Sequence, residues 1–227
     1  MGYETLLAKQ ALFAGCSLAQ LTELARKLQP RSYHEGDVIF YMGDPGTGLY
    51  LVTRGTVKVS LESADGQETM VALILPGDLF GELAVLDGEP RSATAIAMEP
   101  VEALFLRRED FVDFIEHTPG MAMRVIGMLC RRLRQTDELL GDLVFYNVSG
   151  RVAKKLLELA RTHGVHANGG VAIRLPLTQQ ELANLVGSSR ESVNKVMRYF
   201  RERRYVSIDR RYITLHQPEQ LEALVAL

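Results

Sequence analysis

The sequence contains only two cysteines among 227 residues, Cys16 and Cys130. Two thiols are too few for a disulfide framework or for a four-thiolate iron–sulfur cluster. No apolar run approaches the roughly 18 residues that a membrane-spanning helix needs. The first residues, Met1 to Thr5, also lack the basic and then apolar segment of a secretion signal. We therefore expect a cytoplasmic protein that has no membrane partner.

Patterns typical of metal sites and dinucleotide sites are also missing. The five histidines are His34, His117, His163, His166 and His216. Only His34 lies near the strands predicted below, whereas a cupin-like oxygenase needs clustered histidine and carboxylate ligands on its strands. No Gly-x-Gly-x-x-Gly opens a helix, so a dinucleotide-binding fold has no support. No nucleophile–base pair is visible either. We expect no bound metal, and an enzyme such as a cupin-like oxygenase or a nucleotide hydrolase is the weaker alternative.

The chain has little net charge, but its positive charge is concentrated in one segment. The net charge is −2, yet residues 190–211 hold eight basic and three acidic residues, so this segment carries +5 and the rest about −7. A local excess of this kind is typical of a surface that binds an acidic polymer. The alternative is a solvated helix face.

Short strands are predicted between Tyr33 and about Leu106. Alternating or apolar runs are separated there by glycine and Asp-Gly turns. The predicted strands are 38–41, 49–53, 57–61, 69–75, 93–97 and 102–106. Many short strands with regular turn signals are typical of a double-sheet jelly roll or a barrel. Residues 4–29, before them, carry helical spacing.

A long helix is predicted from about Pro119 to Tyr146. Its apolar seam has alternating spacings of four and three residues, at Ala122, Ile126, Leu129, Leu133, Thr136, Leu140 and Leu143. This heptad pattern favours a two-helix coiled coil, and hence a homodimer through residues 122–143. The alternative is a buried helix of a monomer, which has a wider apolar stripe. Residues 147–150, Asn-Val-Ser-Gly, then break the pattern and predict a hinge.

The last part of the chain is predicted to carry a helix-turn-helix. A helix near 151–161 and a glycine-rich loop around 164–170 come first. Residues 178–181 (Thr-Gln-Gln-Glu) and 188–191 (Ser-Ser-Arg-Glu) then read as two capping boxes whose helix starts lie ten residues apart. Ala183 is small enough for the two helices to lie close together, and Gly187 is expected in the turn between them. The alternative is a plain helical hairpin with a charged face.

The second helix of this pair offers side chains suited to double-stranded DNA. Arg190 can donate to guanine O6 and N7, and Glu191 can accept from a cytosine amino group. Lys195, one turn later, can reach a base or a phosphate. Gln180 and Ser189 lie near helix N-termini and suit phosphates. A hairpin at 205–215, with Asp-Arg-Arg at 209–211 at its tip, would be a wing that adds backbone contacts.

A second binding pattern lies in residues 81–93. Glu82 sits in a glycine-flanked turn, and Arg91 and Ser92 follow a short excursion rich in glycine and proline. A buried arginine fork suits a phosphate, the Ser92 hydroxyl and free turn amides add donors, and Glu82 can accept from a sugar hydroxyl. This set predicts a small nucleotide, and the helix-turn-helix that follows makes the nucleotide a signal rather than a substrate.

Three motifs carry a resemblance to a known family: Gly81-Glu82-Leu83-Ala84 with Arg91-Ser92, residues 147–153 (Asn-Val-Ser-Gly-Arg-Val-Ala), and Ser189-Arg190-Glu191. Along essentially its whole length the chain resembles the cyclic-AMP receptor protein branch of the bacterial CRP–FNR regulators. The resemblance implies an α+β fold in three parts. These are a jelly-roll (double-stranded β-helix) sensor domain at 1–118, a dimerisation helix with hinge at 119–147, and a winged helix-turn-helix at 148–227.

The resemblance also implies the ligand and the residues that hold it. The ligand set is Gly81, Glu82, Leu83, Ala84, Arg91 and Ser92, with Glu82 on the ribose hydroxyl and Arg91 and Ser92 on the cyclic phosphate. Thr136 would lie at the purine together with residue 137 of the partner subunit. The implied effector is cyclic AMP, the implied DNA sites are TGTGA-like palindromes, and RNA polymerase is an implied partner.

Two residues depart from the family pattern. Residue 137 is Asp where the best-known members carry a hydroxyl residue, which leaves cyclic GMP as an alternative effector. Lys195 stands where the family usually has Arg, which would soften readout at one base pair. The same scaffold can also serve a regulator that senses redox state or haem, or one that has no ligand. The intact Glu82, Arg91 and Ser92 argue against a sensor of redox state or haem.

Overall fold

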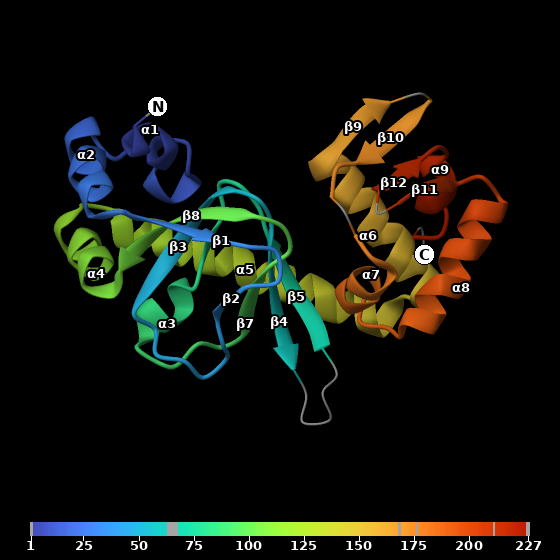
Figure 1. Ribbon diagram of the computed structural model, residues 1–227, viewed down its shortest axis with the longest axis horizontal. Coiled ribbons are helices and arrows are strands. Elements are labelled where there is room, and N and C mark those ends of the chain that lie inside the picture. Colours follow the sequence, from blue (N-terminus) through green and yellow to red (C-terminus); the bar gives the residue numbers. More distant parts are fainter. Residues whose placement is uncertain (1, 63–67, 168, 176, 211, 226–227) are drawn as a thin grey trace. The chain divides into compact units, whose positions relative to one another are not determined.

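The computed structural model describes residues 2–62, 68–167, 169–175, 177–210 and 212–225. The chain forms two compact units, residues 1–134 and 135–227 (Figure 1). Helix α5 (Met121–Phe145) begins in the first unit and ends in the second. The division into three domains at 118 and 147 stays a prediction.

The first unit begins with three short helical elements rather than one long helix. These are α1 (Tyr3–Ala8), the 3₁₀ helix η1 (Ala11–Phe13) and α2 (Leu18–Lys27). Ser17 caps α2 by accepting a hydrogen bond from the Gln20 amide at 3.3 Å, and the Gln20 side chain accepts one from the Ser17 amide. The helical spacing predicted for 4–29 therefore corresponds to three separate short helices, and strand β1 already begins at Gln29.

Two four-stranded antiparallel sheets follow, as a jelly roll requires. One has the order β1 (Gln29–Tyr33), β8 (Val101–Arg107), β3 (Gly48–Arg54) and β6 (Leu79–Phe80). The other has the order β2 (Val38–Phe40), β7 (Thr94–Ala97), β4 (Val57–Glu62) and β5 (Glu68–Ile74). All six predicted strands are present, whereas β1 and β6 were not predicted. Buried side chains from both sheets, among them Val52, Val57 and Ala95, form one apolar core.

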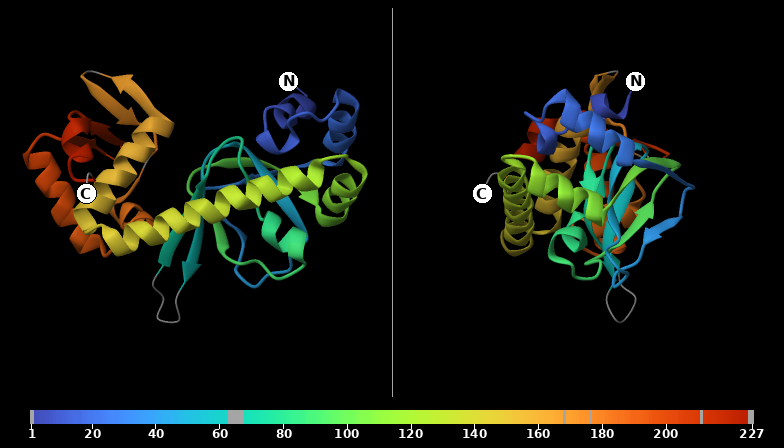
Figure 2. Two further views of the ribbon diagram at one scale, coloured as in Figure 1. Left: turned by 180° about the vertical axis from the view of Figure 1, so that it is seen from behind. Right: turned by 90° about the vertical axis from the view of Figure 1, so that its left-hand side faces the viewer.

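A second apolar core lies under the helices of the first unit. It joins α1, η1, α2 and α4 (Arg108–His117) to the start of α5 and to side chains of β3 and β8. Met121 and Val125 of α5 are buried in it. The N-terminal part of α5 is thereby fixed against the sandwich (Figure 2).

Helix α5 is continuous and leaves most of its predicted seam exposed, although Leu129 is partly buried against the apolar core of the first unit. Its bounds, Met121–Phe145, agree with the predicted 119–146. The exposed fractions of the seam side chains are 49% for Ile126, 62% for Leu133, 56% for Leu140 and 42% for Leu143. Several large apolar side chains this exposed on one helix face are unusual for a surface that contacts only solvent.

The second unit has the elements of a winged helix-turn-helix. In chain order these are α6 (Val148–His163), β9 (Gly164–Ala167), β10 (Gly170–Ile173), α7 (Gln179–Leu185), α8 (Arg190–Glu202), β11 (Val206–Asp209), β12 (Tyr212–Leu215) and α9 (Pro218–Glu222). The sheet order is β11-β12-β10-β9. Val152 and Leu156 of α6 and Phe200 of α8 are fully buried in this unit.

Two predictions about the second unit were wrong in detail. The break between α5 and α6 lies at residues 146–147 rather than over the predicted 147–150, because Asn147 caps α6 by accepting from the Gly150 amide at 3.0 Å and residues 148–150 form its first turn. The range 164–170, predicted as a glycine-rich loop, instead forms strand β9 and the start of β10. Gly164 to Ala167 pair with Gly170 to Ile173 in a hairpin. The predicted wing is present as β11 and β12, while Arg211 at its tip lies outside the described residues.

Candidate ligand site and nucleic-acid interface

The predicted turn at Glu82 is a short helix instead. Helix α3 (Glu82–Asp87) is bounded by Gly81 and Gly88, whose φ angles are +76° and +78°. Gly81 has a second constraint, since a Cβ there would lie 2.6 Å from Nη1 of Arg91. A side chain at residue 81 would therefore displace Arg91 as well as strain the backbone.

The Glu82 carboxylate is buried and only partly satisfied. Its side chain is 2% exposed, and its Oε1 accepts a short hydrogen bond from Nη1 of Arg132 on α5. Nη2 of Arg132 donates to the Leu79 carbonyl at 3.0 Å. Burial raises the pKa of Glu82 above its ordinary value, while the positive charges of Arg132 and Arg91 act against that rise.

The Arg91 guanidinium is also buried, and it already has protein partners. Nη1 donates to the Gly81 carbonyl and Nη2 to the Gly48 carbonyl, both at 2.6 Å. Burial lowers the pKa of Arg91. Both terminal nitrogens of Arg91, which were predicted to bind a phosphate, thus donate to backbone carbonyls instead.

One atom of each charged group remains without a partner. Among the residues that the structure describes, no group forms a hydrogen bond with Oε2 of Glu82 or Nε of Arg91. Both side chains are more than nine-tenths buried. An unsatisfied buried polar atom costs about 1–3 kcal/mol, and more for a charged group. A ligand with a hydroxyl for Glu82 and an anionic oxygen for Arg91 would remove both costs.

The other predicted ligand residues differ in exposure. Ser92 is exposed beside Arg91, and Leu83 is 37% exposed on α3. Ala84 is buried where Gly46 passes so closely that a Cβ on Gly46 would lie 2.5 Å from the Ala84 Cβ. Thr136 and Asp137 are exposed on the part of α5 that belongs to the second unit, and their contact with a purine stays a prediction.

Two residues of this site escaped prediction from the sequence. In the sequence Arg132 is only a charge beside the seam of the long helix, yet it binds Glu82, 50 positions earlier. Phe40 belongs to a strand pattern, and its ring faces the Arg91 guanidinium. The spacing of apolar residues along a helix or strand indicates which face is buried. It does not show which residue, far away in the sequence, a side chain contacts.

The helix-turn-helix has one of its two predicted capping boxes. Thr178 and Glu181 form the first box, with hydrogen bonds of 2.6 and 3.1 Å. The second box was wrong by one residue. Ser189 rather than Ser188 caps α8, and it accepts from the Ser192 amide at 3.2 Å, so Glu191 is not the reciprocal partner. The reason is that Gly187, at φ +58°, and the bond from the Ser188 amide to the Ala183 carbonyl extend the turn.

The side chains predicted to bind DNA are accessible. Arg190, Glu191 and Lys195 lie on the open face of α8, while Val193, Val196, Met197 and Phe200 bury the opposite face. Arg190 and Glu191 occupy the first turn of α8, which is the part of a recognition helix that reaches base edges. The Ser189 hydroxyl is engaged as the helix cap, and Gln180 donates to Asn184 at 2.8 Å.

The turn before α8 is held by contacts that the sequence did not predict. Nη1 of Arg151 on α6 donates to the carbonyls of Val186 and Gly187, at 2.7 and 2.9 Å. A Cβ at Gly187 would lie 2.8 Å from the Leu143 side chain of α5. The end of α5 and the start of α6 thus both lie against the turn that precedes α8.

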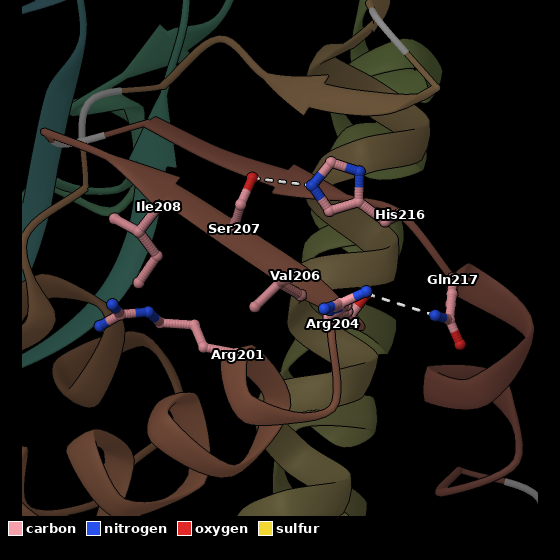
Figure 3. A pocket seen from close by; sticks show the side chains of 7 residues that line it. All are labelled: Arg201, Arg204, Val206, Ser207, Ile208, His216 and Gln217. Carbon is pink, nitrogen blue, oxygen red and sulfur yellow. Dashed lines mark hydrogen bonds between the residues drawn. The ribbon is translucent and has the colours of Figure 1, made fainter.

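A pocket of about 550 Å³ lies at the other end of α8, beside the wing (Figure 3). Its lining includes Arg201 and Arg204, and Ser207 and His216 form a hydrogen bond of 2.8 Å within it. None of the residues predicted to bind DNA or nucleotide lines it. This pocket is therefore separate from the predicted ligand residues Glu82 and Arg91.

The part of the chain that the structure describes has no cluster of metal-ligating side chains. Within it, no three or more His, Cys, Asp or Glu residues are grouped so that they could hold a metal ion. No helix formed by those residues is both long enough and apolar enough to cross a membrane.

Two family models match the chain. Residues 30–118 match the cyclic nucleotide-binding domain, and residues 150–224 match the Crp-like helix-turn-helix domain. The first range contains Glu82 and Arg91, and the second contains α7, α8 and the wing.

Named relatives cover nearly the whole chain. A CRP-like cAMP-activated global transcriptional regulator of Mycobacterium tuberculosis is 35% identical over 96% of this chain and 97% of its own. The cyclic AMP receptor protein of Thermus thermophilus is 37% identical over 94% and 95%. Among solved structures, a CRP/FNR-family transcriptional regulator of Thermus thermophilus has a TM-score of 0.72 and 28% identity, covering 88% of this chain and 99% of that one.

Proposed function

The chain belongs to the CRP/FNR family of transcription regulators, and we propose that it is a homodimer that binds cyclic AMP and, in response, palindromic TGTGA-like DNA sites. The coarser function is established by the family: this is a cyclic-nucleotide-binding, DNA-binding regulator and not an enzyme. The proposal concerns the identity of the nucleotide, the residues that hold it, the dimer, the DNA site and a contact with RNA polymerase.

The observation that carries the choice of ligand is the pair of buried atoms left without a partner among the described residues, Oε2 of Glu82 and Nε of Arg91. A cyclic nucleotide has a ribose hydroxyl that donates to a carboxylate and a phosphate anion that accepts from a guanidinium. Ser92 is exposed beside Arg91 and adds a hydroxyl donor to the same phosphate. Glu82 keeps Arg132 on its other oxygen, so its charge stays balanced when the ribose binds.

Calorimetry with cyclic AMP and with cyclic GMP tests the choice of nucleotide. We expect cyclic AMP to bind at one site per chain and about tenfold or more tightly than cyclic GMP. That ratio equals about 1.4 kcal/mol, which is of the size of one hydrogen bond to the purine edge. Preference for cyclic GMP would reject cyclic AMP as the effector, and absence of heat with both ligands would reject the nucleotide site itself.

The dimer proposal rests on the exposed seam of α5. Leu133, Leu140 and Leu143 are spaced as a heptad, and each exposes more than two-fifths of its side chain. A second copy of the same helix covers such a seam, because heptad side chains pack as knobs into holes. The twofold symmetry of that pair presents two α8 helices to successive major grooves, roughly 34 Å apart, which accounts for a palindromic site.

We expect the nucleotide signal to reach DNA through Thr136 and Asp137. Both are exposed on α5, and the purine would contact Thr136 of one subunit and Asp137 of the other. Thr136→Ala and Asp137→Ala should leave a dimer in sedimentation experiments that binds DNA non-specifically. Both should lose most of the enhancement of specific binding by cyclic AMP, a coupling of about 1–3 kcal/mol.

The alternative role for Thr136 is to set the register of the seam, as polar seam residues do. A gel-shift titration separates the two roles. Full response of both variants to cyclic AMP would mean that the signal takes another route. Loss of the dimer in the Thr136→Ala variant would assign that residue to register.

A further inference from the structure

Phe40 lies against the charged end of Arg91. The guanidinium carbon is 4.2 Å from the centre of the Phe40 ring. Phe40 ends strand β2 and is half-buried, and its own position is fixed by two neighbouring rings. The Phe80 ring is 5.8 Å away and stacked, and the Tyr50 ring is 6.0 Å away. The Phe40 ring is therefore part of a packed aromatic cluster rather than a loose surface side chain.

The guanidinium fits between this ring and two glycines. Its Nη atoms donate to the carbonyls of Gly81 and Gly48. A Cβ at Gly81 would lie 2.6 Å from Nη1 of Arg91 and 3.3 Å from Cε1 of Phe40. Ring, carbonyls and glycine backbone together define the plane and direction of the guanidinium. In that orientation Nε is the nitrogen left without a partner among the described residues.

We propose that Phe40 is a positioning residue for the nucleotide phosphate: its ring holds the Arg91 guanidinium so that Nε faces the ligand. This inference rests on the proposed function, because it concerns the same phosphate. A cation over an aromatic face is held most strongly where water is excluded, and Arg91 is buried. The ring also fixes the guanidinium before the ligand arrives, so less conformational freedom is lost on binding.

The test compares three variants in cyclic AMP calorimetry. Phe40→Leu removes the ring but keeps an apolar side chain, and we expect about five- to tenfold weaker binding. Phe40→Tyr keeps the ring and should restore affinity to within about twofold of the parent. Phe105→Leu is the matched control, because Phe105 is half-buried in the same aromatic cluster but its ring lies under Arg31, at 5.5 Å. It should bind as the parent does.

A double-mutant cycle with Arg91→Met distinguishes positioning from general packing. If the ring acts through the guanidinium, Phe40→Leu should change affinity less than about twofold in the Arg91→Met background. An equal loss in both backgrounds, or parent affinity in Phe40→Leu, overturns the inference. Failure of the unmodified protein to bind any cyclic nucleotide would instead reject the proposed function.

A measurement without ligand covers the case in which Phe40→Leu is unstable. The ¹⁵Nε resonance of Arg91 should be sharp and shifted in the parent and in Phe40→Tyr. In Phe40→Leu, or in Phe40→Met as a second variant, it should move towards the position of exposed arginines. An unchanged Arg91 resonance in the variants that lack the ring contradicts the inference.

Discussion

Arg91→Ala should weaken cyclic AMP binding about tenfold or more. A hydrogen bond to a charged group contributes about 1.5–3 kcal/mol, and the Arg91 guanidinium is a buried cation whose Nε has no partner among the described residues. The measurement is calorimetry on the folded variant. Unchanged affinity would remove Arg91 from the phosphate site.

Two controls separate this loss from damage to the fold. Arg91→Ala also leaves the carbonyls of Gly81 and Gly48 without their donor, so a lower melting temperature is expected. Arg91→Lys keeps a charge but not the planar guanidinium, and it should fall between the parent and Arg91→Ala in affinity. Arg31→Ala removes an exposed arginine that also lies over an aromatic ring, and it should bind cyclic AMP like the parent.

Arg190→Ala should cost about 1–3 kcal/mol of specific DNA binding and relax the preference at one base pair. Arg190 is exposed in the first turn of α8, where a bidentate contact with guanine is geometrically accessible. Competition gel shifts would compare a TGTGA-type palindrome with versions that replace single guanines. The parent should discriminate against one such replacement, and the variant should not.

The matched control for Arg190 lies on the same helix. Arg198 is exposed two turns later on α8, beyond the residues expected to reach base edges. Arg198→Ala should weaken all DNA sequences alike if it contacts phosphate, and none if it does not. A selection from random DNA that returns a non-palindromic or unrelated motif would contradict both the dimer geometry and the role of Arg190.

The strands of the sensor were predictable wherever burial alternates along the chain. The run at 93–97 is such a case, because Ala93, Ala95 and Ala97 are buried while Thr94 and Ile96 between them are only partly buried. Strand β1 was missed because its central residues, Pro30, Arg31 and Ser32, are exposed and carry no apolar period. Its place is set by pairing with β8, whose partner residues lie 68 to 76 positions later, and a local pattern contains no such information.

Helix starts and turns were predictable to about one residue. At 188 and 189 two serines stand side by side, and either can cap a helix. The structure selects Ser189 because Gly187 and Ser188 are needed for the turn. Helix α3 was missed because six residues between two glycines are too few to display a helical period.

The candidate ligand site was predictable in its charges but not in its internal contacts. Glu82 and Arg91 stand out in the sequence as a carboxylate and an arginine near glycines. Nothing in the sequence indicates that the carbonyls of Gly48 and Gly81 already occupy the Arg91 fork, or that Arg132 occupies one Glu82 oxygen. Such contacts depend on the packing of distant segments, which residue type and spacing do not specify.

Gly187 has a consequence for how this chain can vary in the course of evolution. Its backbone adopts a left-handed conformation, and a Cβ there would also collide with Leu143. A smaller side chain at 143 would relieve the collision but not the cost of a left-handed backbone, a conformation that Arg204 and Arg210 also adopt in this chain. Substitution of Gly187 is therefore disfavoured twice, by the backbone and by the collision, whereas the exposed Glu191 and Lys195 nearby are under neither constraint. In descendants of such a protein the exposed face of α8 can therefore change more freely than the glycine in the turn before it.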